Sequence, residues 1–277
     1  MVKINKRSDA KARKEKIIEL LEQKGALAYQ ELEAYFGSSH MTVRRDVDKL
    51  VEDGKVIKTL GGIQKANAPD DFYESRLSSR MAEKKEEKFA IASLALEQIE
   101  TGDIIYLDGS TTCITLAKLI AAKIEGLTVV TNSMYIYWHL ARGKMRNTII
   151  TLGGVHEPDS CCLVGEDTEE SVKKYFINKS FISTKGFVPG EGTYESSVSL
   201  FKIKQGIANQ SLKLFLLIDS SKFGKRALSK VLDSDRINMV ITDDNISDEH
   251  VKQMEESQNN YKVACVENIN NNILSEI

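Results

Sequence analysis

The chain has few prolines and no long apolar segment. It contains three prolines in 277 residues, and no apolar run approaches the roughly 18 residues that a membrane-spanning helix requires. The first 16 residues are polar and basic, so the sequence predicts neither a secretory signal nor a membrane span, and we expect a cytoplasmic protein. With 42% hydrophobic and 28% charged residues, the composition is typical of a globular protein with a substantial core.

Cysteine is also scarce. The four cysteines, Cys113, Cys161, Cys162 and Cys265, form no C-x-x-C pair and have no histidine nearby at ligand spacing. A zinc site is therefore not expected, and the sequence predicts neither a metal nor a cofactor. In a reducing cytosol the four residues are expected to be free thiols. Two interpretations of the adjacent Cys161 and Cys162 stay open: a response to oxidants, or two small packed residues.

Charge is unevenly distributed along the chain. The formal net charge is −2, but residues 1–65 carry 14 Lys and Arg against 10 Asp and Glu. The rest of the chain carries 24 basic against 30 acidic residues. A basic segment suits contact with a phosphate backbone, because Lys and Arg displace condensed counterions. Charge alone equally suits a solvated surface, so a motif is needed to decide.

Residues 39–51 have the pattern of a helix with one buried face. Val43, Val47, Leu50 and Val51 recur at helical spacing, and Ser39 is placed to cap the first turn. The other face is rich in hydrogen-bond donors, which suits contact with DNA. The predicted DNA contacts are Ser39, His40, Thr42, Arg44, Arg45 and Lys49, with Lys55 and Lys58 in the segment that follows. In the alternative interpretation, the two arginines are surface residues paired with Asp46 and Asp48.

Two further helices and a hairpin surround this segment. Helices are predicted over residues 12–23 and 30–36, and only Gly37 and Ser38 separate the second helix from Ser39. A short glycine-containing turn between helices is typical of a helix-turn-helix, whose second helix enters the major groove. Residues 55–59 and 63–65 predict a hairpin with Lys55, Lys58 and Lys65 facing flanking phosphates. Together these elements predict a winged helix-turn-helix domain over residues 1–65.

The most specific motif in this domain is Ser39-x-x-Thr42-Val43-Arg44-Arg45-Asp46. With the helices before it and Leu50-x-x-x-Gly54 after it, the segment resembles the DNA-binding domain of the DeoR family, bacterial repressors of sugar-catabolism operons. Two positions depart from the family pattern. Ala28 stands where Ser or Thr often precedes the second helix, which weakens a cap. Leu60 stands where the wing often carries His, which removes a phosphate contact.

The rest of the chain alternates between strands and helices. Residues 66–71 are polar and include a proline, and we predict a linker over 66–80. A long helix is predicted over 82–99, with the charged cluster 83–88 as its solvated face. Strands are predicted at 104–107, 127–131, 148–152, 181–182, 214–218, 239–242 and 262–266, and helices at 114–123, 169–175, 200–209 and 248–257. This alternation predicts a mostly parallel α/β sheet, covered on both faces, in a domain over 81–277.

Polar or glycine-rich turns follow four of the predicted strands. Ligands of parallel sheets bind at the carboxyl ends of strands, and the first turn leads into a helix whose N–H groups favour an anion. In the alternative interpretation, these turns only cap helices, and Lys185 lies in solvent. We predict that the turns bind an effector through Asp108, Gly109, Ser110, Thr111, Thr112, Asn132, Ser133, Gly153, Gly154, Lys185 and Gly186.

These turns belong to motifs that resemble the DeoR-family sensor domain, among them 102–112, 128–133, 152–154, 164–165, 184–186 and 219–224. The resemblance adds Lys222 to the effector contacts. It implies a fold similar to ribose-5-phosphate isomerase, a phosphorylated sugar as effector, and a homodimer or homotetramer that binds a double-stranded operator less tightly when the effector is bound. One departure concerns the helix at 200–209, where acidic residues often precede a lysine; here Glu195 lies slightly upstream.

Two other functions are weighed against this one. The first is a sugar-phosphate isomerase-like enzyme with an appended DNA-binding domain. The similar isomerases carry acidic residues on the loop that here reads Ser183–Gly186, which has none, leaving Asp108 and Glu195 as candidate bases. The second is an architectural DNA protein without a ligand, against which the ordered polar turns argue. The sequence therefore predicts a non-enzymatic transcriptional repressor of a carbohydrate-catabolism operon, released by a phosphorylated sugar.

Overall fold

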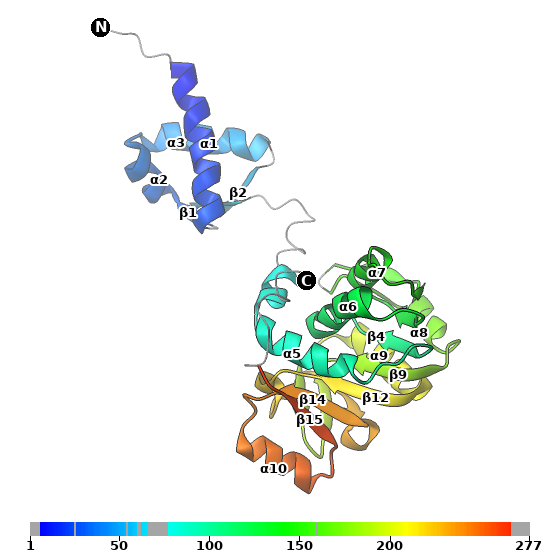
Figure 1. Ribbon diagram of the computed structural model, residues 1–277. Helices are drawn as coiled ribbons and strands as arrows, with labels where there is room; N and C mark the ends of the chain where they lie inside the picture. The colour runs from blue at the N-terminus through cyan, green and yellow to red at the C-terminus, as the bar shows by residue number, and fades with distance from the viewer. Residues whose placement is uncertain are drawn as a thin grey trace. The chain divides into compact units, whose positions relative to one another are not determined.

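The computed structural model describes residues 6–24, 26–53, 55–59, 62–65, 77–158 and 160–266. They divide into two compact units, Met1–Ser75 and Arg76–Ile277 (Figure 1). Each unit has a hydrophobic core of its own. The wing residues Leu60 and Gly61, the linker 66–71 and the side chain of Lys65 lie outside the described part of the chain.

The first unit packs three helices on a small antiparallel sheet. Its elements are α1 (Lys6–Lys24), β1 (Ala26–Ala28), α2 (Tyr29–Phe36), α3 (His40–Glu52), β2 (Val56–Thr59) and β3 (Gly62–Lys65). The sequence predicts only the hairpin β2–β3, but β1 pairs with β3 and gives the order β1-β3-β2. Three residues, two of them alanine, are too short a run to show the alternation that identifies a strand. Leu32, Val47 and Ile63 are fully buried in the core.

Helix α3 buries Val43, Val47 and Leu50 against this core. The prediction that Val51 completes the stripe is wrong, because its side chain is 36% exposed. At 3.6 residues per turn, Val51 lies about 80° around the helix from Val43, beyond the edge of the buried face. Asp46 is buried instead, and Nε of Arg13 on α1 donates a 2.7 Å hydrogen bond to its Oδ2.

The second unit is built on a seven-stranded sheet in which every neighbouring pair is parallel, as the sequence predicts. The strand order is β15-β14-β12-β9-β4-β5-β6. The strands are β4 (Ile104–Leu107), β5 (Thr128–Thr131), β6 (Thr148–Thr151), β9 (Ile177–Ile182), β12 (Ser211–Leu217), β14 (Met239–Asp243) and β15 (Tyr261–Ala264). The chain first extends the sheet from β4 towards β6, and then from β9 on the other side towards β15. The order therefore reverses between β4 and β9, which is where open parallel sheets bind ligands.

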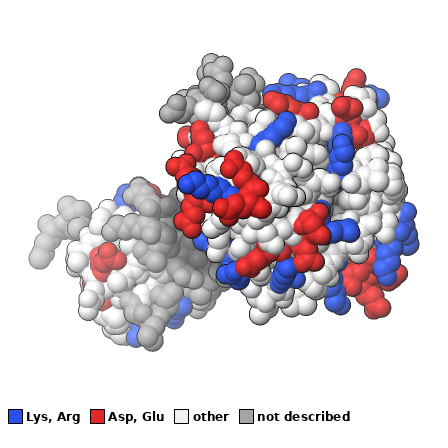
Figure 2. Space-filling view, turned by 90° about the horizontal axis from the view of Figure 1, so that it is seen from below, with Lys and Arg blue, Asp and Glu red and all other residues white. Residues whose placement is uncertain are grey.

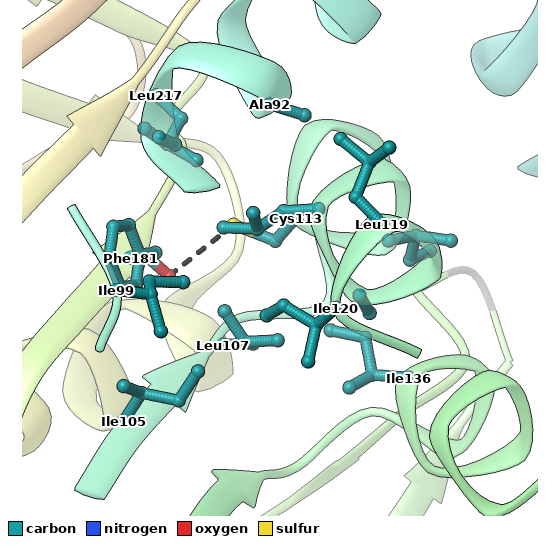
Figure 3. Packing of buried hydrophobic residues seen from close by; sticks show 14 of the residues in the cluster. Ala92, Ile99, Ile105, Leu107, Cys113, Leu119, Ile120, Ile136, Phe181 and Leu217 are labelled. Carbon is teal, nitrogen blue, oxygen red and sulfur yellow. Dashed lines mark hydrogen bonds between the residues drawn. The ribbon is translucent and has the colours of Figure 1, made fainter. Parts of the chain in front are cut away.

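Helices cover both faces of this sheet. On one face, α5 (Lys85–Leu96), α6 (Thr111–Lys123) and α7 (Met134–Ala141) pack on Ile105 and Leu107 of β4 (Figure 3). On the other face, α8 (Glu166–Val172), α9 (Val198–Gln210) and α10 (Asp248–Glu256) contribute to the cluster that holds Tyr106. Alternate residues of β4 thus face opposite cores, as strand geometry requires. None of the helices in the described ranges is long and apolar enough to cross a membrane.

Three features of this unit differ from the sequence prediction. The helix predicted over 82–99 is broken: residues 77–82 form one helical segment, Glu83 and Lys84 form a turn, and α5 begins at Lys85. Residues 77–80, assigned to the linker, are thus helical. Two antiparallel sheets were also missed, because their strands are only three to five residues long. They are β7 (Val155–Glu157) with β8 (Cys162–Val164), and β10 (Gly186–Val188) with β11 (Gly192–Glu195) and β13 (Ser229–Asp233).

Candidate functional site

Helix α3 presents exposed basic side chains. Arg44, Arg45 and Lys49 all face solvent. The alternative pairing of the two arginines with Asp46 and Asp48 is not what the structure shows. Asp46 is held by Arg13, while Oδ1 of Asp48 lies 2.5 Å from Nζ of Lys58. Neither arginine forms an ion pair with any residue in the described ranges, so both guanidinium groups are available to another molecule.

Other predicted DNA contacts have partners inside the unit. The hydroxyl of Ser39 lies 3.0 Å from that of Thr42 and does not accept a hydrogen bond from the first turn, so the predicted side-chain cap is wrong. Nδ1 of His40 lies 2.5 Å from Oε1 of Glu33 and joins α3 to α2 across the turn. Lys58 is engaged by Asp48, whereas Lys55 is exposed. Arginine and lysine side chains of α3 and Lys55 therefore form the accessible basic surface.

The helix-turn-helix is stabilised at both ends of α2. Ala28 has no side-chain acceptor. The backbone N–H of Ala28, however, donates a 2.9 Å hydrogen bond to the carboxylate of Glu31, and this bond is half of a capping box. At the other end, Gly37 adopts φ +56°, a left-handed conformation that glycine enters without steric cost, and its N–H donates to the carbonyl oxygen of Glu33. The departure at Ala28 is therefore compensated within the same turn.

The second unit contains a polar pocket where the turns after β4 and β9 meet. The cavity has a volume of about 210 Å³. The structure brings together in its wall eight of the predicted effector contacts, Asp108, Gly109, Ser110, Thr111, Thr112, Asn132, Lys185 and Lys222. The pocket lies at the reversal of strand order, beside the carboxyl ends of β4 and β9.

The other four predicted effector contacts do not line this pocket. Ser133 caps α7, accepting a 3.4 Å hydrogen bond from the N–H of Ile136. Gly153 accepts a hydrogen bond through its carbonyl from Thr168, and a Cβ on Gly154 would lie 2.0 Å from the Thr168 hydroxyl. A Cβ on Gly186 would lie 2.1 Å from the carbonyl oxygen of Lys225. Gly154 and Gly186 therefore permit close packing of the chain, whereas a Cβ on Gly153 would meet no atom within 4 Å.

Asp108 orders the floor of the pocket. Its Oδ1 accepts from the N–H of Ser110 at 3.0 Å, and its Oδ2 from the N–H of Ser183 at 2.9 Å, so one carboxylate joins the turns after β4 and β9. Ser110 caps α6 through the N–H of Cys113. The backbone N–H groups of the first helical turn have no acceptor within the helix, and with the helix dipole they favour an anion. A Cβ on Gly109 would lie 2.1 Å from Sγ of Cys162, so this glycine permits close packing too.

Basic side chains exceed acidic ones in the pocket wall. Six basic residues, Arg80, Lys84, Lys88, Lys185, Lys204 and Lys222, face four acidic ones, Glu83, Asp108, Glu195 and Asp219. Burial lowers the pKa of Lys185, and the neighbouring Arg80 and Lys222 lower it further. A bound anion would relieve this repulsion. On the face of the second unit seen in Figure 2, basic and acidic side chains are interspersed.

Lys204 of α9 is buried between two carboxylates, and sequence reasoning missed it. Its Nζ donates to Glu195 and, at 2.7 Å, to the carbonyl oxygen of Ser183, and it lies 3.4 Å from Oδ2 of Asp108. Burial disfavours the charged form of Lys204, but Glu195 and Asp108 outweigh burial and raise its pKa. Both candidate bases are thus already paired. The only feature of the sequence that pointed to this buried ion pair was Glu195, which lies upstream of the helix.

The segment 77–88 supplies four pocket residues that the sequence analysis also missed, namely Arg80, Glu83, Lys84 and Lys88. The charged cluster 83–88 was predicted to be solvated throughout, and for Lys88 this is wrong, because the residue is only 6% exposed. No group of three or more metal-ligating side chains occurs in the part of the chain that the structure describes. The arrangement suits an anionic ligand with hydrogen-bonding groups.

Comparison with known proteins identifies both units. Residues 13–68 match the family described as the DeoR-like helix-turn-helix domain, and residues 83–244 match the DeoR C terminal sensor domain. The chain is 32% identical over 257 residues to the uncharacterized HTH-type transcriptional regulator YulB of Bacillus subtilis, covering 92% of this chain and 96% of that protein. It is also 32% identical over 235 residues to the regulator IolR of the same organism, covering 84% and 91%.

A third relative is named for its function. The lactose phosphotransferase system repressor of Staphylococcus epidermidis is 32% identical over 234 residues, covering 84% of this chain and 92% of that protein. Among solved structures, ribose 5 phosphate isomerase A from Neisseria gonorrhoeae aligns with 50% of this chain and 53% of its own at 15% identity and a TM-score of 0.38, a distant similarity. The sequence relatives are transcriptional regulators and not enzymes. The chain belongs to the DeoR family of DNA-binding transcriptional regulators.

Proposed function

We propose that this regulator represses a carbohydrate-catabolism operon and that a phosphorylated sugar, bound in the pocket of the second unit, releases it from the operator. The observation that carries the proposal is the pocket itself. It combines the N-terminus of α6 with an excess of basic side chains at the strand-order reversal. Relatives named as a lactose phosphotransferase system repressor and a putative aga operon repressor support the choice of a carbohydrate system.

In the proposed complex, α3 enters the major groove of the operator. Arg44 and Arg45 are the candidates for base contacts, because an arginine can donate two hydrogen bonds to one guanine. Lys49 and Lys55 would contact phosphates, which hold the helix in register without reading sequence. A homodimer or homotetramer would present two or more copies of α3 to repeated half-sites, as helix-turn-helix proteins do.

In the pocket, we assign the two ends of the ligand to different walls. The phosphate would lie against the first-turn N–H groups of α6, with Lys185 and Lys222 completing its charge balance. The sugar hydroxyls would face the buried polar wall, where the Tyr106 hydroxyl donates to Oδ1 of Asn132 at 2.9 Å. Buried polar groups of this kind discriminate strongly between ligands, because a wrong ligand leaves them unpaired.

DNA-binding experiments test the proposal directly. Fragments of the source genome that bind the full chain are selected, and the bound duplex is titrated in gel shifts with individual triose to hexose phosphates. We expect at least one sugar phosphate to weaken DNA binding tenfold or more, while the same sugar without phosphate has no effect. Release by no member of the panel, or release by the unphosphorylated sugar alone, would contradict the proposal.

A pair of lysine variants locates the effector. Lys185→Gln removes a charge from the pocket wall, whereas Lys213→Gln removes one from the exposed part of β12. We expect Lys185→Gln to bind DNA normally and to need at least tenfold more effector for release. Lys213→Gln should respond like the parent protein. Equal responses of the two variants would place the effector elsewhere.

A further inference from the structure

The wall of the pocket includes the chain segment that leads from the first unit into the second. Arg80, Lys84 and Lys88 all line the cavity. This segment is not one continuous helix, because residues 77–82 and α5 are separated by a turn at Glu83 and Lys84. Lys84 adopts φ +53°, a left-handed conformation that is uncommon for a residue with a side chain. The bend therefore needs stabilising contacts.

Lys88 supplies those contacts. Its side chain is buried, and its ammonium donates to the backbone carbonyl oxygens of Arg80 and, at 2.5 Å, of Glu83. Carbonyl groups at the end of a helix have no partner within the helix, so they need an external donor. The ammonium of Lys88 serves both carbonyls and fixes the end of the helical segment 77–82.

Lys88 is also one of the residues that line the pocket. A lysine ammonium has three N–H donors, and the two carbonyls use two of them. Burial lowers the pKa of Lys88, and the charge of nearby Lys222 acts in the same direction, whereas Asp219 opposes it. An anion in the cavity would favour the charged form of Lys88 and could accept its third hydrogen bond. Arg80, whose carbonyl Lys88 binds, lines the same cavity.

We propose that Lys88 couples the pocket to the segment that leads to the DNA-binding unit. A phosphate group accepts the third N–H of Lys88 while the other two hold the carbonyls of Arg80 and Glu83, so that occupancy of the pocket stabilises the bend at Lys84. The inference rests on the proposed function, since it uses the same anion site. It assigns two roles to Lys88, contact with the ligand and positioning of the bend. A ligand can shift the bend only if its contacts differ between the bent and the unbent arrangement.

Hydrogen exchange on the full chain tests this coupling, with inorganic phosphate as the probe and chloride at equal ionic strength as the reference. Peptides covering residues 108–112 report on the anion site, and peptides covering 77–88 report on the bend. In the parent protein we expect phosphate to slow exchange several-fold in both regions. In Lys88→Met we expect slowing at 108–112 to remain and slowing at 77–88 to disappear.

Lys85→Met is the matched control, because Lys85 is an exposed residue of the same helix and does not line the pocket; it should respond like the parent protein. Slowing at 108–112 with no change at 77–88 in the parent protein would overturn the coupling alone. No slowing at 108–112 would overturn the anion site and the coupling with it. Slowing at 77–88 that persists in Lys88→Met would also overturn the coupling. The measurements at 108–112 and 77–88 in the parent protein alone can overturn the proposal, even if Lys88→Met does not fold.

Discussion

Nζ of Lys204 lies 3.4 Å from Oδ2 of Asp108, and the same ammonium donates to Glu195, so a single buried cation is shared by two buried carboxylates. The three side chains come from α9, from the turn after β4 and from β11. The same Oδ2 of Asp108 accepts from the N–H of Ser183. This cluster thus joins the parallel sheet to the small antiparallel sheet beside the pocket.

Replacing Lys204 by Met should destabilise the protein strongly. The change leaves Asp108 and Glu195 buried without their counter-charge, and removing one partner of a buried ion pair costs about 3–5 kcal/mol. Urea unfolding monitored by circular dichroism measures the loss. Lys202→Met is the control, because Lys202 is exposed and lies 3.7 Å from Glu169, a surface pair whose loss should cost less than about 1 kcal/mol. Similar unfolding midpoints for the two variants would contradict the assignment.

The stabilising effect of Lys204 should persist to high pH. Its pKa is raised in the folded protein by Glu195 and Asp108 despite burial. Because the pKa is raised on folding, the contribution of Lys204 to the free energy of unfolding is fully present below its unfolded-state pKa of 10.5. This contribution is lost as the pH rises through the pKa of Lys204 in the folded protein. The difference in unfolding free energy between parent and Lys204→Met should therefore be constant from pH 7 to 10 and decrease above 10.5. A difference that already decreases between pH 7 and 9 would argue against this charge pairing.

Replacing Arg13 by Met should destabilise the first unit and weaken DNA binding. Asp46 would be left buried on α3 without the Arg13 hydrogen bond, a loss of about 1–3 kcal/mol. Hydrogen exchange of α3 peptides and gel shifts measure the two effects. Lys11→Met, at an exposed position on the same helix, should change neither. If Arg13→Met leaves α3 exchange unchanged, the Arg13–Asp46 pair does not stabilise α3.

Arg44→Ala and Arg45→Ala should each weaken binding to the selected operator. Both side chains are exposed on α3 and lack a described ion-pair partner, and a base contact by an arginine is worth about 1–3 kcal/mol. Gel shifts with specific and random duplexes separate the two roles. An arginine that reads a base loses discrimination, whereas one that binds phosphate loses affinity for both duplexes equally. Lys174→Ala, an exposed position in the second unit, serves as the control.

Only one of the four thiols should react rapidly in the folded protein. Cys265 is exposed, whereas Cys113, Cys161 and Cys162 are buried. Burial raises the pKa of Cys162 to about 12, so that at pH 8 only about one thiol in 10⁴ is the reactive thiolate. Iodoacetamide labelling followed by mass spectrometry should modify Cys265 first. Rapid labelling of Cys162 at pH 8 would favour the oxidant-responsive interpretation of the cysteine pair.

The sequence predicted the parts of the fold that repeat with a regular period. Buried parallel strands are continuous apolar runs, and the stripe Val43–Val47–Leu50 has helical spacing, so both are visible along the chain. Val51 was wrongly assigned to the buried face of α3, because the spacing of apolar residues does not show where that face ends. The bend at Lys84 has no sequence signature, since neither proline nor glycine marks it.

The candidate site was predictable where it lies directly after a strand, and not where it depends on contacts between distant elements. Asp108 and Lys185 follow strands and could be placed. Lys204 and Glu195 could not, because their pairing is created by the packing of α9 on β11. Lys88 was assigned to solvent because lysine is rarely buried, and only the two carbonyls that it binds explain the exception. Four predicted contacts, Ser133, Gly153, Gly154 and Gly186, do not line the pocket.

The pairing of β1 with β3 fixes the position of β3 in the first unit. A Cβ on Gly62 would lie 2.3 Å from the carbonyl oxygen of Leu27, so the two strands meet at a separation that any larger residue would prevent. The inner strand of the hairpin is thus anchored between the first two helices and cannot swing as an independent arm. The spacing between α3 and the base of the hairpin is therefore a constant of the domain.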